Sequence, residues 1–223
     1  MYEKLIIFLL VVAGAYNISN AQGLSNAFDG ICRIETDSGR GSGFVVAKAA
    51  GKFEVWTNAH VAGQVGQRIV ARFNVGRSSE RAFKGVVSWA EYSSSVDASK
   101  LIVVGDYGGD VFRISDCSSC GVISVTGGHP LGLRSYAIAL SPFSEADFGE
   151  VRAYRPPSIE GQSGSPIVNE SGEVIGVVTL RMGKGKNAVG GMLPISQWTR
   201  TGSKPVSVLG FGDFKPIANA IVD

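Results

Sequence analysis

A serine within a run of small residues is the first candidate for chemistry in this sequence. The segment Gly161-Gln162-Ser163-Gly164-Ser165-Pro166 precedes an apolar stretch. Its small residues permit a tight turn that exposes one hydroxyl and aligns main-chain N–H donors. Ser163 is therefore a candidate nucleophile for attack on a carbonyl carbon. Because a Gly-x-Ser-Gly stretch is often only a turn, the other groups that this chemistry requires must be found elsewhere.

A serine hydroxyl is a weak nucleophile near neutral pH, so it needs a base within hydrogen-bond reach, and histidine is the usual one. The chain has two histidines. His60 ends the strand-like segment KFEVWTNAH, whereas His129 lies in the loop-like segment Gly-Gly-His-Pro. We predict that His60 is the base, the alternative being a buried, hydrogen-bonded core histidine. We interpret His129 as an ordinary loop residue.

The base in turn needs a carboxylate that fixes its tautomer and stabilises the imidazolium formed during attack. Asp97 lies between the Ser93-Ser94-Ser95 turn and a predicted strand, whereas Asp106, Asp110 and Asp116 lie in or beside connecting loops. We predict that Asp97 takes this role, the alternative being a solvated turn residue.

The segments that must position these groups are short, apolar and separated by Gly, Ser and Asn, a pattern that favours strands joined by tight turns. The predicted strands of the first half are 30–36, 42–47, 53–57, 68–74, 82–89 and 101–104, followed by a connection over 105–110. Those of the second half are 111–114, 121–127, 135–140, 149–154, 165–169, 173–180 and 189–195. No long helix is predicted. The fold class is therefore all-β, with two β units of similar size.

Composition and the N-terminus narrow the class of protein. A net charge of +2 with scattered Lys and Arg argues against a nucleic-acid surface. Lys4 precedes an apolar run from Leu5 to Ala15, and small residues follow at Ser19 and Ala21. This pattern predicts a signal peptide over residues 1–21 and a secreted or periplasmic protein. A membrane anchor is the alternative, but a spanning helix needs about 20 apolar residues. We therefore expect no stable membrane insertion once the signal is removed.

The cysteine spacing Cys117-Ser-Ser-Cys120 has three readings. A small loop disulfide is the one we predict. A zinc site needs about four ligands, and only Cys32 and the two histidines remain to complete it. A redox motif normally opens a helix beside a βαβ unit, a pattern that is not found around this spacing. We therefore predict no metal and no other cofactor.

The segments Gly41–Val46 and Thr57–Val61, then Asp97, then Gly161–Val168 occur in the order found in trypsin-like serine proteases. The order His, Asp, Ser is that of the chymotrypsin type. From about Gly30 to Ser196, the chain resembles bacterial proteases of the high-temperature-requirement and glutamyl-endopeptidase kinds. This resemblance implies two antiparallel six-stranded β-barrels with the active site in the cleft between them. The implied division is a barrel over 22–108 with His60 and Asp97, a barrel over 109–200 with Ser163, and a tail over 201–223.

The same resemblance implies a serine endopeptidase that works through an acyl-enzyme without a cofactor. The N–H groups of Gly161 and Ser163 would form the oxyanion hole. A polypeptide substrate would lie as an extended strand beside Thr179, Leu180 and Arg181, with Ser158 also in the substrate-binding pocket. The oligomeric state stays open.

Two positions of that pocket bear on specificity. Pro157 stands where proteases specific for Lys or Arg carry an aspartate, and Val178 stands where glutamyl endopeptidases carry a histidine. We therefore expect a small or medium apolar residue before the cleaved bond.

Two residues depart from the family pattern. Lys100 occupies a position expected to be apolar, and Gln162 replaces the aspartate that pairs with a newly cut N-terminus in zymogen-activated relatives. Activation by that route is therefore not expected. Alternative functions are an inactive binding module and a dedicated viral or phage processing protease. The presence of both His60 and Ser163 disfavours the first, and the apparent leader disfavours the second.

Overall fold

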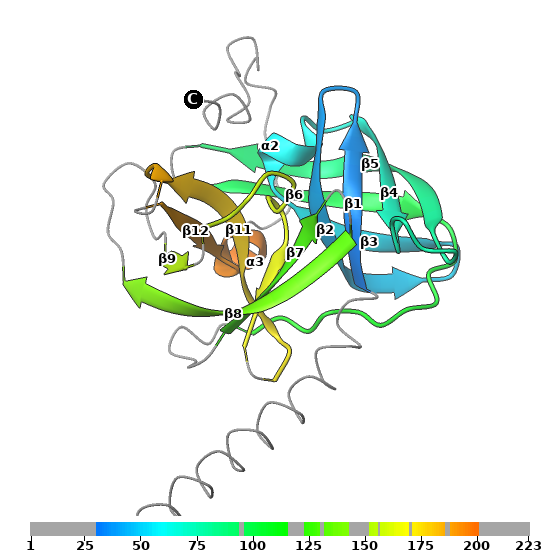
Figure 1. Ribbon diagram of the computed structural model, residues 1–223. Helices are drawn as coiled ribbons and strands as arrows, with labels where there is room; N and C mark the ends of the chain where they lie inside the picture. The colour runs from blue at the N-terminus through cyan, green and yellow to red at the C-terminus, as the bar shows by residue number, and fades with distance from the viewer. Residues whose placement is uncertain are drawn as a thin grey trace, which may run out of the picture.

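The computed structural model describes residues 30–93, 96–115, 123–129, 132–142, 152–155, 157–169, 171–185 and 188–200. These residues form a mostly-β structure, as predicted, with two six-stranded sheets (Figure 1). Cys117 and Cys120 lie outside the described residues, so their predicted disulfide stays a prediction. Within the described residues, no helix is long and apolar enough to cross a membrane.

The first sheet is a closed antiparallel barrel in the order β1-β2-β3-β6-β5-β4. Its strands are β1 (Ile31–Thr36), β2 (Gly39–Ala49), β3 (Lys52–Thr57), β4 (Arg68–Phe73), β5 (Arg81–Tyr92) and β6 (Asp97–Val104). Alternate residues of these strands point inward, where Phe53 contacts Phe73 and Phe83 edge to face with ring centroids 5.8 and 5.3 Å apart. Cys32 joins this core, and burial raises the pKa of its thiol.

Glu35 on β1 forms one ion pair within its own strand and one with β4. Glu35 accepts from Arg33 at 2.5 Å and from Arg72 at 2.7 Å. Burial opposes ionisation of Glu35, but the hydrogen bond from Arg72 and the charge of Arg33 outweigh it and lower the pKa of the carboxyl.

The second sheet follows the order β10-β11-β12-β9-β8-β7 and also closes. Its strands are β7 (Ile123–His129), β8 (Gly132–Pro142), β9 (Arg152–Arg155), β10 (Pro166–Val168), β11 (Val174–Met182) and β12 (Val189–Pro194). The prediction of a loop at His129 was wrong, because the β7–β8 ladder continues through the two preceding glycines until His129 pairs with Gly132.

The connection between the sheets replaces the strand predicted at 111–114, which was wrong. Its main-chain groups are divided between the two sheets. The Phe112 N–H donates to the Val45 carbonyl at 2.8 Å, and the Arg113 carbonyl accepts from the Val174 N–H at 2.8 Å. Only an isolated bridge between Ile114 and Val174 remains of a ladder there.

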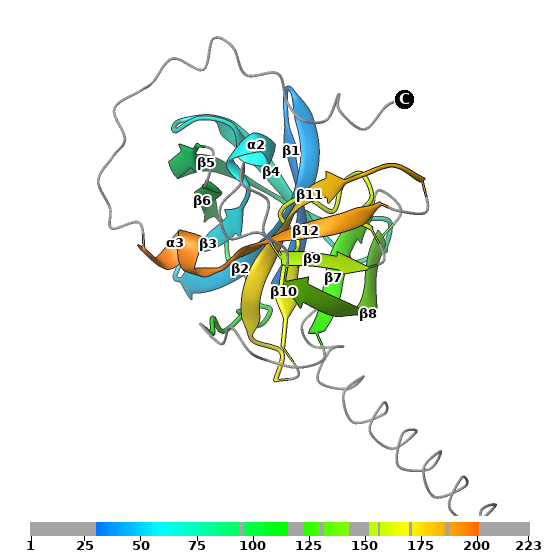
Figure 2. The ribbon, with the colours of Figure 1, turned by 90° about the vertical axis from the view of Figure 1, so that its left-hand side faces the viewer.

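Two short helices complete the described structure, α2 (Ala59–Ala62) after β3 and α3 (Ser196–Arg200) after β12. Helix α3 crosses to the first barrel and packs against β6, as Figure 2 shows. Its Trp198 is fully buried in an apolar cluster that contains residues of both sheets, among them Phe44 and Val177. The last described element therefore holds the two sheets together.

Candidate active site

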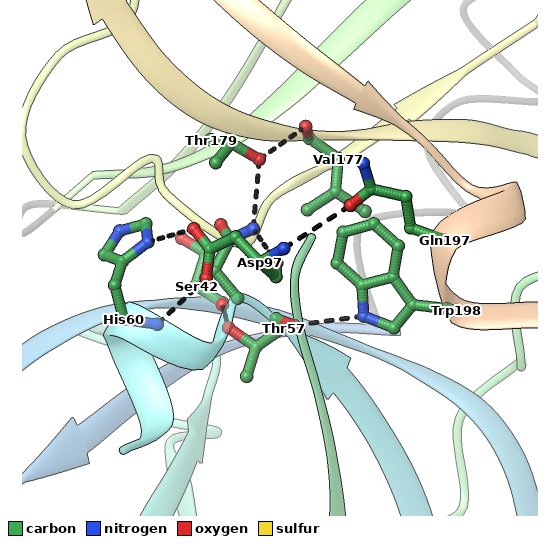
Figure 3. A network of polar contacts seen from close by, with 9 residues as sticks. Ser42, Thr57, His60, Asp97, Val177, Thr179, Gln197 and Trp198 are labelled. Atoms are coloured by element: carbon green, nitrogen blue, oxygen red, sulfur yellow. Dashed lines mark hydrogen bonds and ion pairs between the residues drawn. The ribbon is translucent and has the colours of Figure 1, made fainter. Parts of the chain in front are cut away.

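The structure brings His60 and Asp97 into direct contact at one end of the first barrel. His60 is the second residue of α2, and Asp97 is the first residue of β6. Asp97 is buried, and its Oδ2 accepts from the His60 ring at Nδ1, 2.5 Å away (Figure 3). Its other oxygen, Oδ1, accepts from the His60 main-chain N–H at 3.0 Å. One carboxylate therefore fixes both the ring and the main chain of the histidine.

A tight hairpin places Asp97. Tyr92 and Asp97 pair across β5 and β6, and the Ser93 N–H donates to the Val96 carbonyl at 2.7 Å. Burial and the negative charge of Asp97 raise the pKa of Tyr92. The unexpected Lys100 lies on the outer face, with its Nζ 5.2 and 5.4 Å from the ring centroids of Trp56 and Trp89. A lysine fits there because the flanking indoles attract its charge and cover its stem.

The turn that carries Ser163 depends on two glycines. Gly161 and Gly164 both have φ of 86°, a region that residues with a Cβ rarely adopt. A Cβ on Gly164 would also overlap the carbonyl oxygen of Ser42 and the hydroxyl of Thr57. The turn is braced by the Gln162 side chain, whose Oε1 accepts from the Ile159 N–H at 2.9 Å. Gln162, which stands where zymogen-activated relatives carry an aspartate, therefore stabilises this turn with an uncharged hydrogen bond.

Ser42 joins this turn to the first barrel. Its N–H donates to the Ser163 carbonyl at 2.7 Å, and its Oγ donates to the Gly161 carbonyl at 2.7 Å. The Ser42 carbonyl accepts in turn from the Thr57 hydroxyl at 2.6 Å. Ser42 and Thr57 are fully buried. These bonds fix the position of Ser163 relative to the strand that leads to His60.

A cavity of about 100 Å³ gathers the predicted site residues. Its lining includes His60, Ser158, Gly161, Ser163, Thr179, Leu180 and Arg181. Ser158 is buried, and its hydroxyl donates to the Leu180 carbonyl at 2.7 Å. Within the part of the chain that the structure describes, Ser163 Oγ and the His60 ring share no hydrogen bond, and the N–H groups of Gly161 and Ser163 donate to no acceptor. Catalytic hydrogen bonds often tighten only once substrate is bound.

Sequence reasoning missed several residues of this region. Arg40, at the β1–β2 hairpin, also lines the cavity, and its guanidinium lies 4.0 Å from the carboxylate of Glu160, which belongs to the predicted pocket segment just before Ser163. Asn58 and Trp198 hold the surrounding main chain. For Asn58 and Trp198, the one signal in the sequence was the polar pair Thr57-Asn58 at the end of an otherwise buried strand. Across the described ranges, no cluster of three or more His, Cys, Asp or Glu side chains is arranged to hold a metal ion.

Comparison with known proteins accounts for this arrangement. A family model described as a trypsin-like peptidase domain matches residues 41–177. The chain belongs to the trypsin-like peptidase family. The match spans the segments of His60, Asp97 and Ser163, so the resemblance inferred from those segments is confirmed. A search of curated protein sequences gave no significant match.

Solved structures of proteases share the fold of this trypsin-like peptidase. An inactive form of the Rv3671c protease of M. tuberculosis is 20% identical with a TM-score of 0.62, covering 81% of this chain and 91% of that one. A serine endoprotease from Yersinia pestis is 18% identical with a TM-score of 0.63, covering 81% and 64%. An HtrA-type protease solved with a tripeptide is 17% identical with a TM-score of 0.63, covering 81% and 61%. The trypsin-like peptidase thus spans less than two thirds of the latter two chains, and at these identities the likeness concerns the fold.

Proposed function

We propose that this protein is a secreted or periplasmic serine endopeptidase in which Ser163 is the nucleophile, His60 the general base and Asp97 the residue that orients His60. The observation that carries the proposal is that His60, held by Asp97 through two hydrogen bonds, lines the same cavity as Ser163. Family membership supports it independently.

The proposed reaction proceeds through an acyl-enzyme. Ser163 Oγ bonds to the carbonyl carbon of the scissile peptide while its proton passes to His60. The carbonyl oxygen becomes an oxyanion, for which the unengaged N–H groups of Gly161 and Ser163 are the proposed donors. The C–N bond then breaks and His60 protonates the leaving amine. Water repeats the same steps on the acyl-enzyme, which releases the acid and regenerates Ser163.

The substrate is proposed to bind as an added strand along Thr179 to Arg181. Support comes from the pairing of β11, which β10 accompanies only as far as Val177 and the turn before β10 only as far as Val178. Among the described residues, no strand pairs with that edge of Thr179 to Arg181, where an extended peptide could add. The two closed sheets are proposed to be the two barrels of the chymotrypsin type, with this site in the cleft between them. The domain limits 22–108 and 109–200, the signal peptide 1–21 and the tail 201–223 belong to the same proposal.

A small or medium apolar side chain is the proposed preference before the cleaved bond. The hydroxyl proton of Ser158 is already donated to Leu180, so it is not free to bind an acidic substrate side chain. Arg181 is exposed, where a charge contributes about 1 kcal/mol or less to selectivity. A cleavage profile on a diverse peptide library tests this preference. Dominant cleavage after Lys, Arg or Glu would contradict it.

Labelling with a fluorophosphonate tests the enzyme proposal against the binding-module alternative. The mature chain should react at one serine, and Ser163→Ala and His60→Ala should each abolish labelling and peptide hydrolysis. The control is Ser165→Ala, which removes the neighbouring hydroxyl of the same turn and should still label. Absence of labelling in the folded wild-type protein would reject the proposal.

A further inference from the structure

Asn58 connects the two halves of the candidate site through a single buried side chain. It directly precedes α2 and is 0% exposed. Its Nδ2 donates to the main-chain carbonyl of Asp97 at 2.9 Å and to the hydroxyl of Thr179 on β11 at 3.0 Å. Thr179 passes its own proton to the Val177 carbonyl at 3.1 Å, so its oxygen is fixed as the acceptor for Asn58 (Figure 3). The amide therefore links the first barrel to the proposed substrate-binding strand.

The ordinary role of an asparagine at this position is not the one it has here. Asn58 is the N-cap residue of α2, where such a side chain usually accepts from a main-chain N–H of its own helix. No such bond exists, because Asp97 Oδ1 accepts from the His60 N–H instead. Capping by Asp97 leaves the Asn58 amide to bridge Asp97 and Thr179.

One atom of this side chain has a cost for stability. Asn58 Oδ1 is buried and finds no partner among the described residues. A leucine of similar size would remove that penalty, but it would leave the Asp97 carbonyl without the N–H that Asn58 donates. What asparagine contributes at this position is therefore its pair of donated hydrogen bonds, which an apolar residue cannot make.

We propose that Asn58 is a positioning residue that couples the binding of a peptide along β11 to the placement of Asp97 and His60. This role rests on the proposed peptidase function. A peptide bound along Thr179 to Arg181 restricts the motion of Thr179. Because the Asn58 amide is hydrogen-bonded to both Thr179 and the Asp97 carbonyl, it restricts the main chain of Asp97 in turn. Turnover of an extended peptide then exceeds that of a one-residue amide, which has the same scissile bond but is too short to bind along β11.

Steady-state kinetics of Asn58→Leu on these two substrates test the coupling. We expect kcat on a hexapeptide to fall about tenfold to hundredfold, the scale of small misplacements in active sites. The one-residue amide should lose much less, so the ratio of the two kcat values falls. A merely structural role would reduce both values by the same factor. The control is Asn169→Leu, which removes another buried asparagine, hydrogen-bonded to Glu173 and not among the residues that line the cavity, and should leave the ratio unchanged.

Thr179→Val removes the same hydrogen bond from its other end. If the bond carries the coupling, the double variant with Asn58→Leu lowers the kcat ratio no further than either single variant. Should Asn58→Leu fail to fold, Thr179→Val with Thr179→Ser as its control carries the test alone. An unchanged ratio in folded Thr179→Val would overturn the proposal.

A readout without catalysis separates this proposal from the function on which it rests. The chain has only two histidines, so isotope-labelled histidine gives two ring signals, and His129→Gln assigns them. The Nδ1 proton that His60 donates to Asp97 should resonate far downfield in the wild type and in Asn169→Leu, and should move upfield or exchange faster in Asn58→Leu. If the wild type hydrolyses neither substrate, the proposed function fails while this signal still decides the coupling. An identical signal in folded Asn58→Leu refutes it.

Discussion

The hydroxyl of Ser42 gives a sharp test of how the nucleophile turn is held. Ser42→Ala deletes one hydrogen bond, from Oγ to the Gly161 carbonyl at 2.7 Å, and leaves the main-chain bond to Ser163 in place. Losing a buried neutral hydrogen bond and leaving its acceptor without a partner costs about 1–2 kcal/mol. For a domain of this size that corresponds to a decrease in melting temperature of about 2–8 °C.

The effect of Ser42→Ala on turnover should be larger than this loss of stability suggests. Removing an oxyanion donor outright typically lowers kcat by about a hundredfold to a thousandfold. Ser42→Ala only loosens the peptide group beside the proposed donors, so we expect kcat to fall about tenfold to hundredfold at temperatures where the variant is folded.

Ser88→Ala is the matched control, because it also removes a serine hydroxyl that donates to a carbonyl, that of Lys100 at 2.9 Å. Ser88 is exposed and lies on the outside of the barrel, so both its stability and its activity should stay within about 0.5 kcal/mol of the wild type. Calorimetry and peptide kinetics on the three proteins decide the matter. A Ser42→Ala protein with wild-type kcat would refute the reasoning, whatever its melting temperature.

Three further predictions use the same assays. Asp97→Asn should lower kcat about ten-thousandfold, because one amide oxygen cannot accept both N–H groups of His60, and full activity would assign the role to another carboxylate. Gly164→Ala should lose more than about 3 kcal/mol of stability or fail to fold. Its control, Gly172→Ala, replaces a glycine with φ of 76° and open space around it, and should lose only about 1 kcal/mol. Equal losses would show that the overlap of the new Cβ with the Ser42 carbonyl costs nothing. The folded-state pKa of Glu35 lies below the ordinary 4.5, so its ion pairs stabilise the protein above that pH, and this contribution disappears as the pH falls through the lower, folded value. The free energy of unfolding in urea, measured between pH 5.5 and 3, should therefore depend less on pH in Glu35→Gln than in the wild type. Identical pH dependence in the two proteins would contradict this.

Most strands could be predicted because their apolar residues alternate or cluster between glycine-rich turns. The exceptions have identifiable causes. Residues 97–100 at the start of β6 were missed because they are polar or small, although Ser99 is buried and its hydroxyl donates to the Trp89 carbonyl at 3.1 Å. The segment 111–114 has the composition of a strand, but its main chain is divided between two sheets. The local amino-acid composition does not determine which strand a main-chain N–H or carbonyl bonds to.

The candidate triad could be predicted for a different reason. His60, Asp97 and Ser163 lie in short segments whose residue types suit one reaction, so chemistry selects them without knowledge of the fold. The residues that hold them do not share this property. Contacts between segments far apart in the chain bring Ser42, Arg40 and Trp198 to the site. Their local sequence does not predict those contacts.

The contact of Trp198 has a consequence for the order of events during folding. Its Nε1 donates to the carbonyl of Thr57, 141 positions earlier in the chain and next to the segment that leads to His60. The first barrel contains every one of its own strands without this tryptophan, which belongs to α3. A chain can therefore close that barrel and bury its apolar residues while the support beneath His60 is still missing. The geometry of the proposed site is then completed only when α3 docks, after the barrel that carries the histidine has formed.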